Sequence, residues 1–188
     1  MPRDKNKQKK AQHESYLRNK EVIKQRLKIS RRKNKTYVEN YKNQHPCAEC
    51  EEDNVACKDL HHLRDKEINV SRAIQHYGLD RLKKEIDKCQ VFCANCHKKL
   101  HGWPKVTTKD KKKTKNRKFI TEYRKDHPCE ICGETSELCL EFHHLGKKEI
   151  GISRAICDWG IKRLKKEVSK CMVLCANCHR KIHYIYGV

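Results

Sequence analysis

The chain has 188 residues, of which 36% are hydrophobic, so we expect one or two small domains with thin cores. No apolar run approaches the roughly 20 residues that a membrane span requires, and the basic N-terminus lacks the apolar segment of a signal peptide. These features predict an intracellular protein in a reducing compartment, with no membrane partner. A formal net charge of +21 favours a polyanionic partner.

The positive charge is concentrated in two segments. Residues 1–44 carry 15 Lys and Arg against 4 Asp and Glu, and residues 102–126 carry 10 against 3. The remaining segments hold the cysteines and are nearly neutral. Basic runs are often only solvated tails, but beside compact modules they are well placed to bind phosphates by releasing counterions. Nucleic-acid contacts are expected at Lys9, Lys10, Arg31, Arg32, Lys33, Lys111, Lys112 and Lys113.

A tandem duplication organises most of the chain. From Lys33 onward the sequence repeats without a gap at an offset of 82 residues, and 32 of the 57 positions in residues 45–101 are identical in the second copy. We therefore expect a basic arm, a first module, a basic linker and a second module, at residues 1–36, 37–102, 103–118 and 119–188.

Taken in chain order, the arm comes first. Its apolar residues between Gln12 and Lys28 have partly helical spacing, which predicts a marginal helix that orders on DNA. In each repeat a His-Pro pair and a CxxC turn then disfavour helix. Residues 56–62 and 138–144 are expected to form a strand that ends in a histidine doublet, with the two side chains on opposite faces.

Two short helices should follow each of these strands. Ser71 and Ser153 are the expected N-caps of the first helix, and Gly78 and Gly160 lie beyond its end. Residues 89–92 and 171–174 are β-prone and predict a returning strand. That strand leads into a second CxxC and a helix whose two histidines are four residues apart and share one face.

Eight of the 13 cysteines occur in CxxC pairs, two pairs per repeat. Disulfides would suit a secreted protein, but CxxC pairs with histidines in an unexported chain are typical of zinc ligands. Four thiolates form a closed tetrahedral site with a structural role, which compensates for a small core. The two predicted zinc sites are Cys47, Cys50, Cys93 and Cys96, and Cys129, Cys132, Cys175 and Cys178. The other cysteines are expected to be buried thiols.

The joint pattern resembles a known family. The first repeat contains HPCAEC, DLHHL, EIDKC and CANCHKKLH, and the second contains HPCEIC, EFHHL, EVSKC and CANCHRKIH. This order of motifs resembles the HNH endonucleases, which have the ββα-metal fold. The resemblance implies an α+β chain made of two tandem, zinc-stabilised ββα-metal modules with inserted short helices.

The resemblance also implies roles for the histidines. His61, His97, His143 and His179 would bind a catalytic divalent ion, Mg²⁺ or another, while His62 and His144 would act as the general base. His101 and His183 would be a further ligand or would contact the scissile phosphate. In the alternative, one histidine pair joins the zinc, as in Cys₂His₂ fingers, but four cysteines per repeat already saturate a zinc ion.

One position departs from the HNH pattern. The middle Asn would fall near Lys88 and Lys170, and neither is Asn, while Asn95 and Asn177 lie inside the second CxxC. The sequence therefore leaves open whether a backbone carbonyl or another side chain orients the base histidine.

The expected function is that of a DNA endonuclease, most simply on double-stranded DNA, with two HNH sites in one chain that acts as a monomeric pseudo-dimer. The resemblance also implies a phage or mobile-element origin. The alternative is a non-catalytic tandem zinc protein that only binds DNA or RNA.

Overall fold

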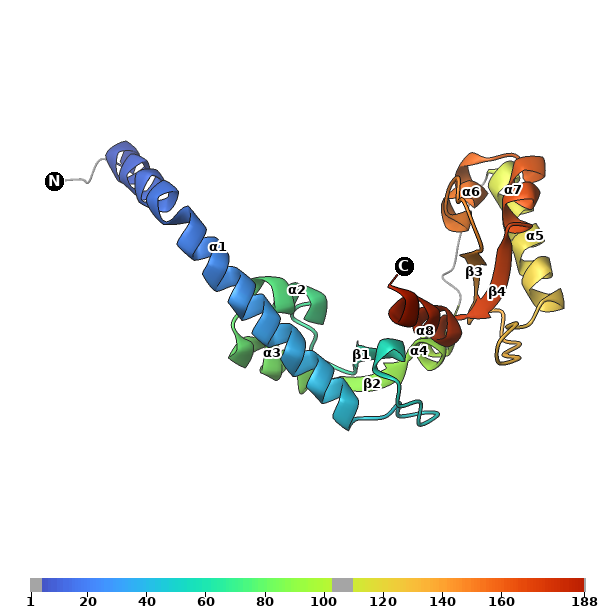
Figure 1. Cartoon of the computed structure of the whole chain (residues 1–188), viewed down its shortest axis with the longest axis horizontal. Coiled ribbons are helices and arrows are strands. Elements are labelled where there is room, and N and C mark those ends of the chain that lie inside the picture. Colours follow the sequence, from blue (N-terminus) through green and yellow to red (C-terminus); the bar gives the residue numbers. More distant parts are fainter. Residues whose placement is uncertain (1–4, 103–109, 188) are drawn as a thin grey trace. The chain divides into compact units, whose positions relative to one another are not determined.

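The computed structural model describes residues 5–102 and 110–187, whose helices and strands are labelled in Figure 1. The described chain is mixed α+β, and each repeat contains a two-stranded sheet, β1–β2 in the first and β3–β4 in the second. The α+β class expected from the sequence is therefore confirmed.

The chain forms two compact units that do not coincide with the repeats. The first contains residues 1–44 and 62–90, and the second contains residues 45–61 and 91–188. The second unit thus holds both CxxC pairs of the first repeat together with the whole second repeat.

The first unit is built on one long helix, α1 (Lys5–Gln44), which extends well beyond the helix predicted between Gln12 and Lys28. The short helices α2 (Val70–His76) and α3 (Leu79–Ile86) lie along its C-terminal half (Figure 1). Asn34 of α1 is buried and donates Nδ2–H to the carbonyls of Ile74, at 3.2 Å, and Tyr77, at 2.9 Å. These carbonyls lie at the end of α2, where a helix has no partners of its own, so α1 caps α2 from the side.

The predicted N-caps are wrong. The N-cap of α2 is Asn69, and α6 (Ile152–Asp158) begins after Gly151, so Ser71 and Ser153 lie in the first turns. In the second repeat the earlier start buries Ile152 against the core. Gly78 and Gly160 lie beyond the ends of α2 and α6, as predicted, and they are the extended N-cap residues of α3 and of α7 (Ile161–Val168).

The strands lie close to where the sequence predicts them. β1 (Lys58–His62) follows a short 3₁₀ turn (Val55–Cys57), and β2 (Cys89–Cys93) runs directly into α4 (Ala94–His101). In the second repeat β3 (Leu140–His144) pairs antiparallel with β4 (Cys171–Cys175), and Leu140 faces Cys175 while His144 faces Cys171. The second repeat ends in α8 (Ala176–Tyr186). Each doublet thus lies at the end of a strand, as predicted.

Two of the three expected module boundaries fall inside helices. α1 runs across position 36, and α5 (Lys111–Asp126) begins within the expected linker. The other linker positions, 103–109, lie outside the described residues. α5 packs on α6 and α7 as α1 packs on α2 and α3, and its buried Asn116 donates to the carbonyls of Ile156 and Trp159 at 3.0 and 2.8 Å.

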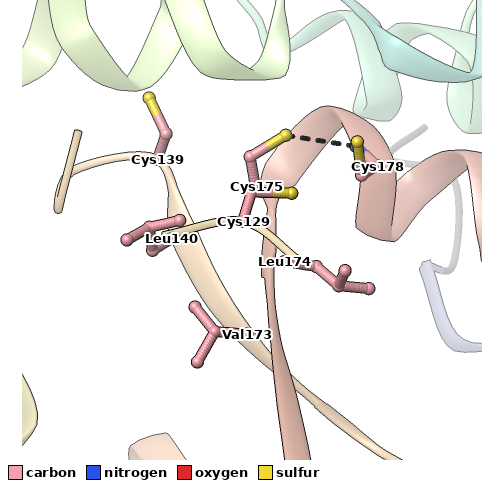
Figure 2. Close-up of a cluster of buried hydrophobic side chains, with 7 residues drawn as sticks. All are labelled: Cys129, Cys139, Leu140, Val173, Leu174, Cys175 and Cys178. Atoms are coloured by element: carbon pink, nitrogen blue, oxygen red, sulfur yellow. Dashed lines mark hydrogen bonds between the residues drawn. The ribbon is translucent and has the colours of Figure 1, made fainter. Parts of the chain in front are cut away.

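The cores are small. Figure 2 shows one cluster of the second repeat, in which Leu140, Val173 and Leu174 lie beside the cysteine thiols. A second cluster lies under α5, α6 and α7 and contains Ile120, Ile152, Ala155, Leu164 and Val168. Among the helices of the described residues, none is both long and apolar enough to cross a membrane.

Candidate metal centres

Four thiols gather in each repeat. The sulfur atoms of each group lie within 4.8 Å of one another, and the two groups are the eight cysteines predicted from the CxxC pairs. In the first repeat one pair sits in the turn before β1. The other pair opens α4, where Cys93 is the N-cap and its Sγ accepts the N–H of Cys96. A metal here would therefore tie a turn to the start of a helix.

The thiol groups fit zinc. A tetrahedral ion with bonds of about 2.3 Å to sulfur requires sulfur atoms about 3.8 Å apart. The sulfur atoms of Cys50 and Cys93 are 3.6 Å apart, and those of Cys132 and Cys175 are 3.7 Å apart. Two Cys₄ sites therefore match two structural zinc ions per chain.

In each group one thiol has a lowered pKa and therefore ionises more readily than an ordinary cysteine. Burial alone would raise the pKa of Cys47, but hydrogen bonds from the backbone of Cys93, Glu49 and Cys50 lower it to about 7. The same holds for Cys129. Burial would raise its pKa, but backbone hydrogen bonds from Cys175, Cys132 and Ile131 lower it to about 7. Because zinc binds the thiolate, each site offers one ligand that is readily deprotonated near neutral pH.

Three histidines per repeat form a second cluster. The first consists of His61, His97 and His101, and the second of His143, His179 and His183. In the first, Nε2 of His97 is 3.1 Å from Nδ1 of His61 and 3.1 Å from Nε2 of His101. In the second, the Nε2 atoms of His179 and His183 are 3.0 Å apart. One turn of α4 or α8 therefore places two imidazoles against a third from the strand end.

A carboxylate sets the tautomer of the central imidazole in each cluster. Nδ1 of His97 is 3.2 Å from Oδ2 of Asp59, and Nδ1 of His179 is 2.6 Å from Oε2 of Glu141. If Nδ1–H donates to the carboxylate, Nε2 carries the lone pair and faces the other two rings, which is the arrangement behind histidine metal ligands. The sequence predicted the histidines but missed Asp59 and Glu141.

The donor set favours a particular class of ion. Three imidazole nitrogens suit zinc, cobalt or nickel, whereas Mg²⁺ prefers oxygen ligands. The expectation of Mg²⁺ is therefore not supported by the residues present. Burial, and next the nearby His179, His183 and His144, lower the pKa of His143, which favours the neutral form that a metal requires. The position of His101 and His183 among the other nitrogens fits a third ligand.

The second histidine of each doublet contacts a buried glutamate. Nε2 of His62 is 2.9 Å from Oε1 of Glu85, and Nε2 of His144 is 3.1 Å from Oε1 of Glu167. Glu85 and Glu167 are 2% and 1% exposed. Each glutamate therefore lies where it can orient the imidazole that it contacts.

These glutamates are held ionised. Burial would raise the pKa of Glu85, but N–H groups of Ile68 and Glu67 and the ammonium of Lys88 lower it to about 2. An ionised Glu85 accepts Nε2–H of His62, so Nδ1 is the atom that can take a proton. The signal was present in the sequence as the glutamate of EIDKC and EVSKC, three residues before the lysine.

A cavity of about 380 Å³ adjoins the first histidine cluster inside the second unit. His97 and His101 line it from the first repeat, and Arg124 and Arg180 line it from the second. Two arginines therefore border the space in front of this cluster.

The predicted phosphate contacts lie on α1 and on the first turn of α5. Lys9, Lys10, Arg32 and Lys33 are exposed on α1, while Arg31 donates to the carbonyl of Gln75. In α5 Lys111 is exposed. Nζ of Lys112 donates to the carbonyl of Asp158, and Nζ of Lys113 lies 4.0 Å from Oδ2 of Asp110.

Comparison with known proteins adds no relative. No protein-family model matches the chain, and neither a curated protein nor a solved structure matches it.

Proposed function

We propose that the chain is a metal-dependent DNA endonuclease of the HNH type, with one hydrolytic site in each repeat. The observation that carries this proposal is the same arrangement found twice. Three imidazole nitrogens converge, and the residue next to one of them in the strand is a histidine that contacts a buried glutamate. A closed structural site does not require this second histidine.

The residues divide the work of hydrolysis as follows. A divalent ion, when bound, supplies Lewis acidity and neutralises the charge of the phosphate. In the second repeat His143, His179 and His183 would hold it. His144 would accept the proton of the attacking water at Nδ1, because its Nε2–H is committed to Glu167. Glu167 keeps the imidazole in that tautomer and stabilises the imidazolium that forms.

The substrate is proposed from charge. α1 presents exposed lysines and arginines beyond the part that packs on α2 and α3, and the first turn of α5 adds three lysines. Lysine-rich helices bind the phosphate backbone by releasing counterions and do not require a base sequence. Double-stranded DNA fits this proposal because a helix of 40 residues is long enough to reach several phosphates along a duplex.

The test is nicking of a supercoiled plasmid by zinc-loaded protein with added Co²⁺, Ni²⁺ or Mn²⁺. We expect cleavage that stops when a chelator removes the added ion. Because a general base contributes about 10²-fold to 10⁴-fold, the double variant His62→Ala/His144→Ala should cut at least about 10²-fold more slowly with unchanged DNA affinity.

The matched control is His45→Ala/His127→Ala, which removes a pair of histidines from equivalent positions outside both clusters. It should retain cleavage. Robust cutting by the His62/His144 variant would contradict the mechanism. A wild-type chain that binds DNA but cuts with none of these ions would be the non-catalytic binding protein instead.

A further inference from the structure

The two repeats meet inside the second unit through reciprocal contacts. The backbone N–H of Asn95 donates to Oδ1 of Asn177 at 3.1 Å, and the N–H of Asn177 donates to Oδ1 of Asn95 at 3.2 Å. The thiols of Cys57 and Cys139 point to the carbonyls of Asn177 and Asn95 in the same crossed way. Each of these contacts therefore occurs twice, and the two occurrences differ only in that every residue is replaced by its counterpart in the other repeat. Such reciprocity is characteristic of a two-fold interface.

Crossed ion pairs surround this pair of asparagines. Lys99 binds Glu134 and Lys181 binds Glu52, each at 2.8 Å. A second crossed set is formed by Arg180 with Asp59 and by Lys98 with Glu141. The second set differs from the first because Asp59 and Glu141 are the carboxylates that contact His97 and His179.

The contacts of Asp59 show how the link works. Its Oδ1 and Oδ2 each accept from Arg180 at 2.9 Å, in a two-pronged pair, and Oδ2 also faces Nδ1 of His97. The guanidinium therefore fixes the plane of the carboxylate that fixes the imidazole. Glu141 uses one oxygen for Lys98 and the other for His179.

We propose that each repeat completes the metal site of the other. Arg180 of the second repeat positions Asp59 for the first histidine cluster, and Lys98 of the first repeat positions Glu141 for the second. This inference rests on the proposed function only in requiring that the histidine clusters bind a metal. The four residues are positioning residues and act on the metal through the imidazoles.

Two opposite effects compete when the cation is removed. Loss of a nearby positive charge favours a bound cation, while loss of carboxylate orientation weakens the ligand behind it. Removing a partner of a ligating histidine costs about 10-fold to 100-fold in metal affinity. Because Arg180 acts one step further away, we expect about a 5-fold loss, with orientation outweighing charge.

The test measures Co²⁺ affinity at one histidine cluster at a time. His143→Ala/His183→Ala leaves only the first cluster, and His61→Ala/His101→Ala leaves only the second. Zinc stays in both Cys₄ sites because it binds thiolates more tightly than Co²⁺ does. Visible absorption of the bound Co²⁺ then reports a dissociation constant for each cluster.

We expect each variant to weaken Co²⁺ binding at the cluster of the other repeat. Arg180→Met should weaken Co²⁺ binding about 5-fold at the first cluster and less than about 2-fold at the second, although Arg180 adjoins His179 in α8. Lys98→Met should do the reverse. A local disturbance of α8 would instead damage the second cluster, so the crossing separates positioning from structural damage.

Two controls remove the remaining explanations. Lys181→Met removes a cation and an interface pair from the same helix but leaves both orienting carboxylates paired, and it should change either affinity less than about 2-fold. Arg180→Lys keeps the charge and copies the lysine used at the equivalent position of the first repeat, so it should preserve binding. Unchanged or tighter binding at the first cluster of Arg180→Met, or equal loss at both clusters, would overturn the inference. If the clusters bind no Co²⁺ before Arg180 or Lys98 is changed, the proposed function fails as well.

Discussion

Glu167 carries its charge in a position almost closed to water, and donors approach both of its oxygens. Oε1 is 3.1 Å from Nε2 of His144 and 2.9 Å from the N–H of Glu149, while Oε2 is 2.6 Å from Nζ of Lys170. The hydrogen bond from Lys170 and those from the N–H groups of Glu149 and Ile150 lower the pKa of Glu167 to about 2, against the effect of burial. A single side chain thus contributes to the stability of the repeat and also sets the tautomer of His144, the histidine that we propose as the general base.

Replacement of this glutamate should therefore affect both properties. Glu167→Ala leaves the N–H of Glu149 and the ring of His144 without their acceptor, and each buried unsatisfied group costs about 1–3 kcal/mol. We expect the free energy of unfolding to fall by about 2–4 kcal/mol in urea denaturation at pH 7, and cleavage by this repeat to fall with it. The exposed Glu122→Gln in α5 is the control and should stay within about 0.5 kcal/mol.

The same carboxyl predicts a pH dependence. Its folded pKa lies below the unfolded value of about 4.3, so its contribution to stability is fully present above that value and is lost as pH falls toward 2. The stability difference between wild type and Glu167→Gln should therefore be constant from pH 7 to about 5 and shrink below about 4.5. A difference that grows on acidification would show that the carboxyl is protonated in the folded chain.

At the scale of single residues, the sequence identified the candidate metal ligands better than the residues that orient them. Cysteine and histidine positions follow from spacing, because a CxxC turn and an i, i+4 pair force their side chains together. Asp59, Glu85 and Arg180 follow from no such rule. Their contacts bring together side chains from different elements and, for Arg180, from different repeats.

The helices and strands also divide into those that the sequence predicted and those that it did not. The strands were predicted within two residues because each is bounded by a CxxC or a histidine doublet. The length of α1 was not predicted, since its mean hydropathy is low and its apolar spacing is irregular beyond Lys28. What fixes α1 in register is Asn34, a buried polar residue that sequence periodicity does not reveal.

Mild chelation should distinguish the Cys₄ sites, which keep their ions, from the histidine clusters, which lose theirs. Each Cys₄ site would bind its ion through four thiolates with no open position, whereas a histidine site with three ligands would stay accessible. Mild EDTA treatment followed by metal analysis should leave two zinc ions per chain with helical circular dichroism unchanged. Cys178→Ser should leave one tightly held ion and unfold the second repeat, because its small core depends on the metal. Loss of both ions under mild EDTA would contradict the structural assignment.

At the scale of the second unit, the reciprocal contacts of Asn95 and Asn177 relate residues 45–61 and 91–101 of the first repeat to their counterparts in the second repeat as a pseudo-two-fold pair. The repeat offset of 82 residues indicated the duplication, but the sequence contained no sign of the crossed ion pairs. An interface of this kind suits a duplex, since the antiparallel strands of B-DNA are themselves related by two-fold axes and a two-fold protein reads both strands equivalently.

This symmetry predicts the cleavage products of single variants. If each repeat cuts one strand, inactivating one of them by His62→Ala or by His144→Ala should convert a linearising enzyme into a nickase, with the two variants nicking opposite strands. Strand-resolved mapping of cuts on a supercoiled plasmid measures this directly. Cutting by both variants should weaken steeply with salt, because the phosphate contacts proposed for the lysines of α1 and α5 would act through counterion release. If either single variant still linearises the plasmid efficiently, or if both nick the same strand, the repeats do not act as a symmetric pair on the duplex.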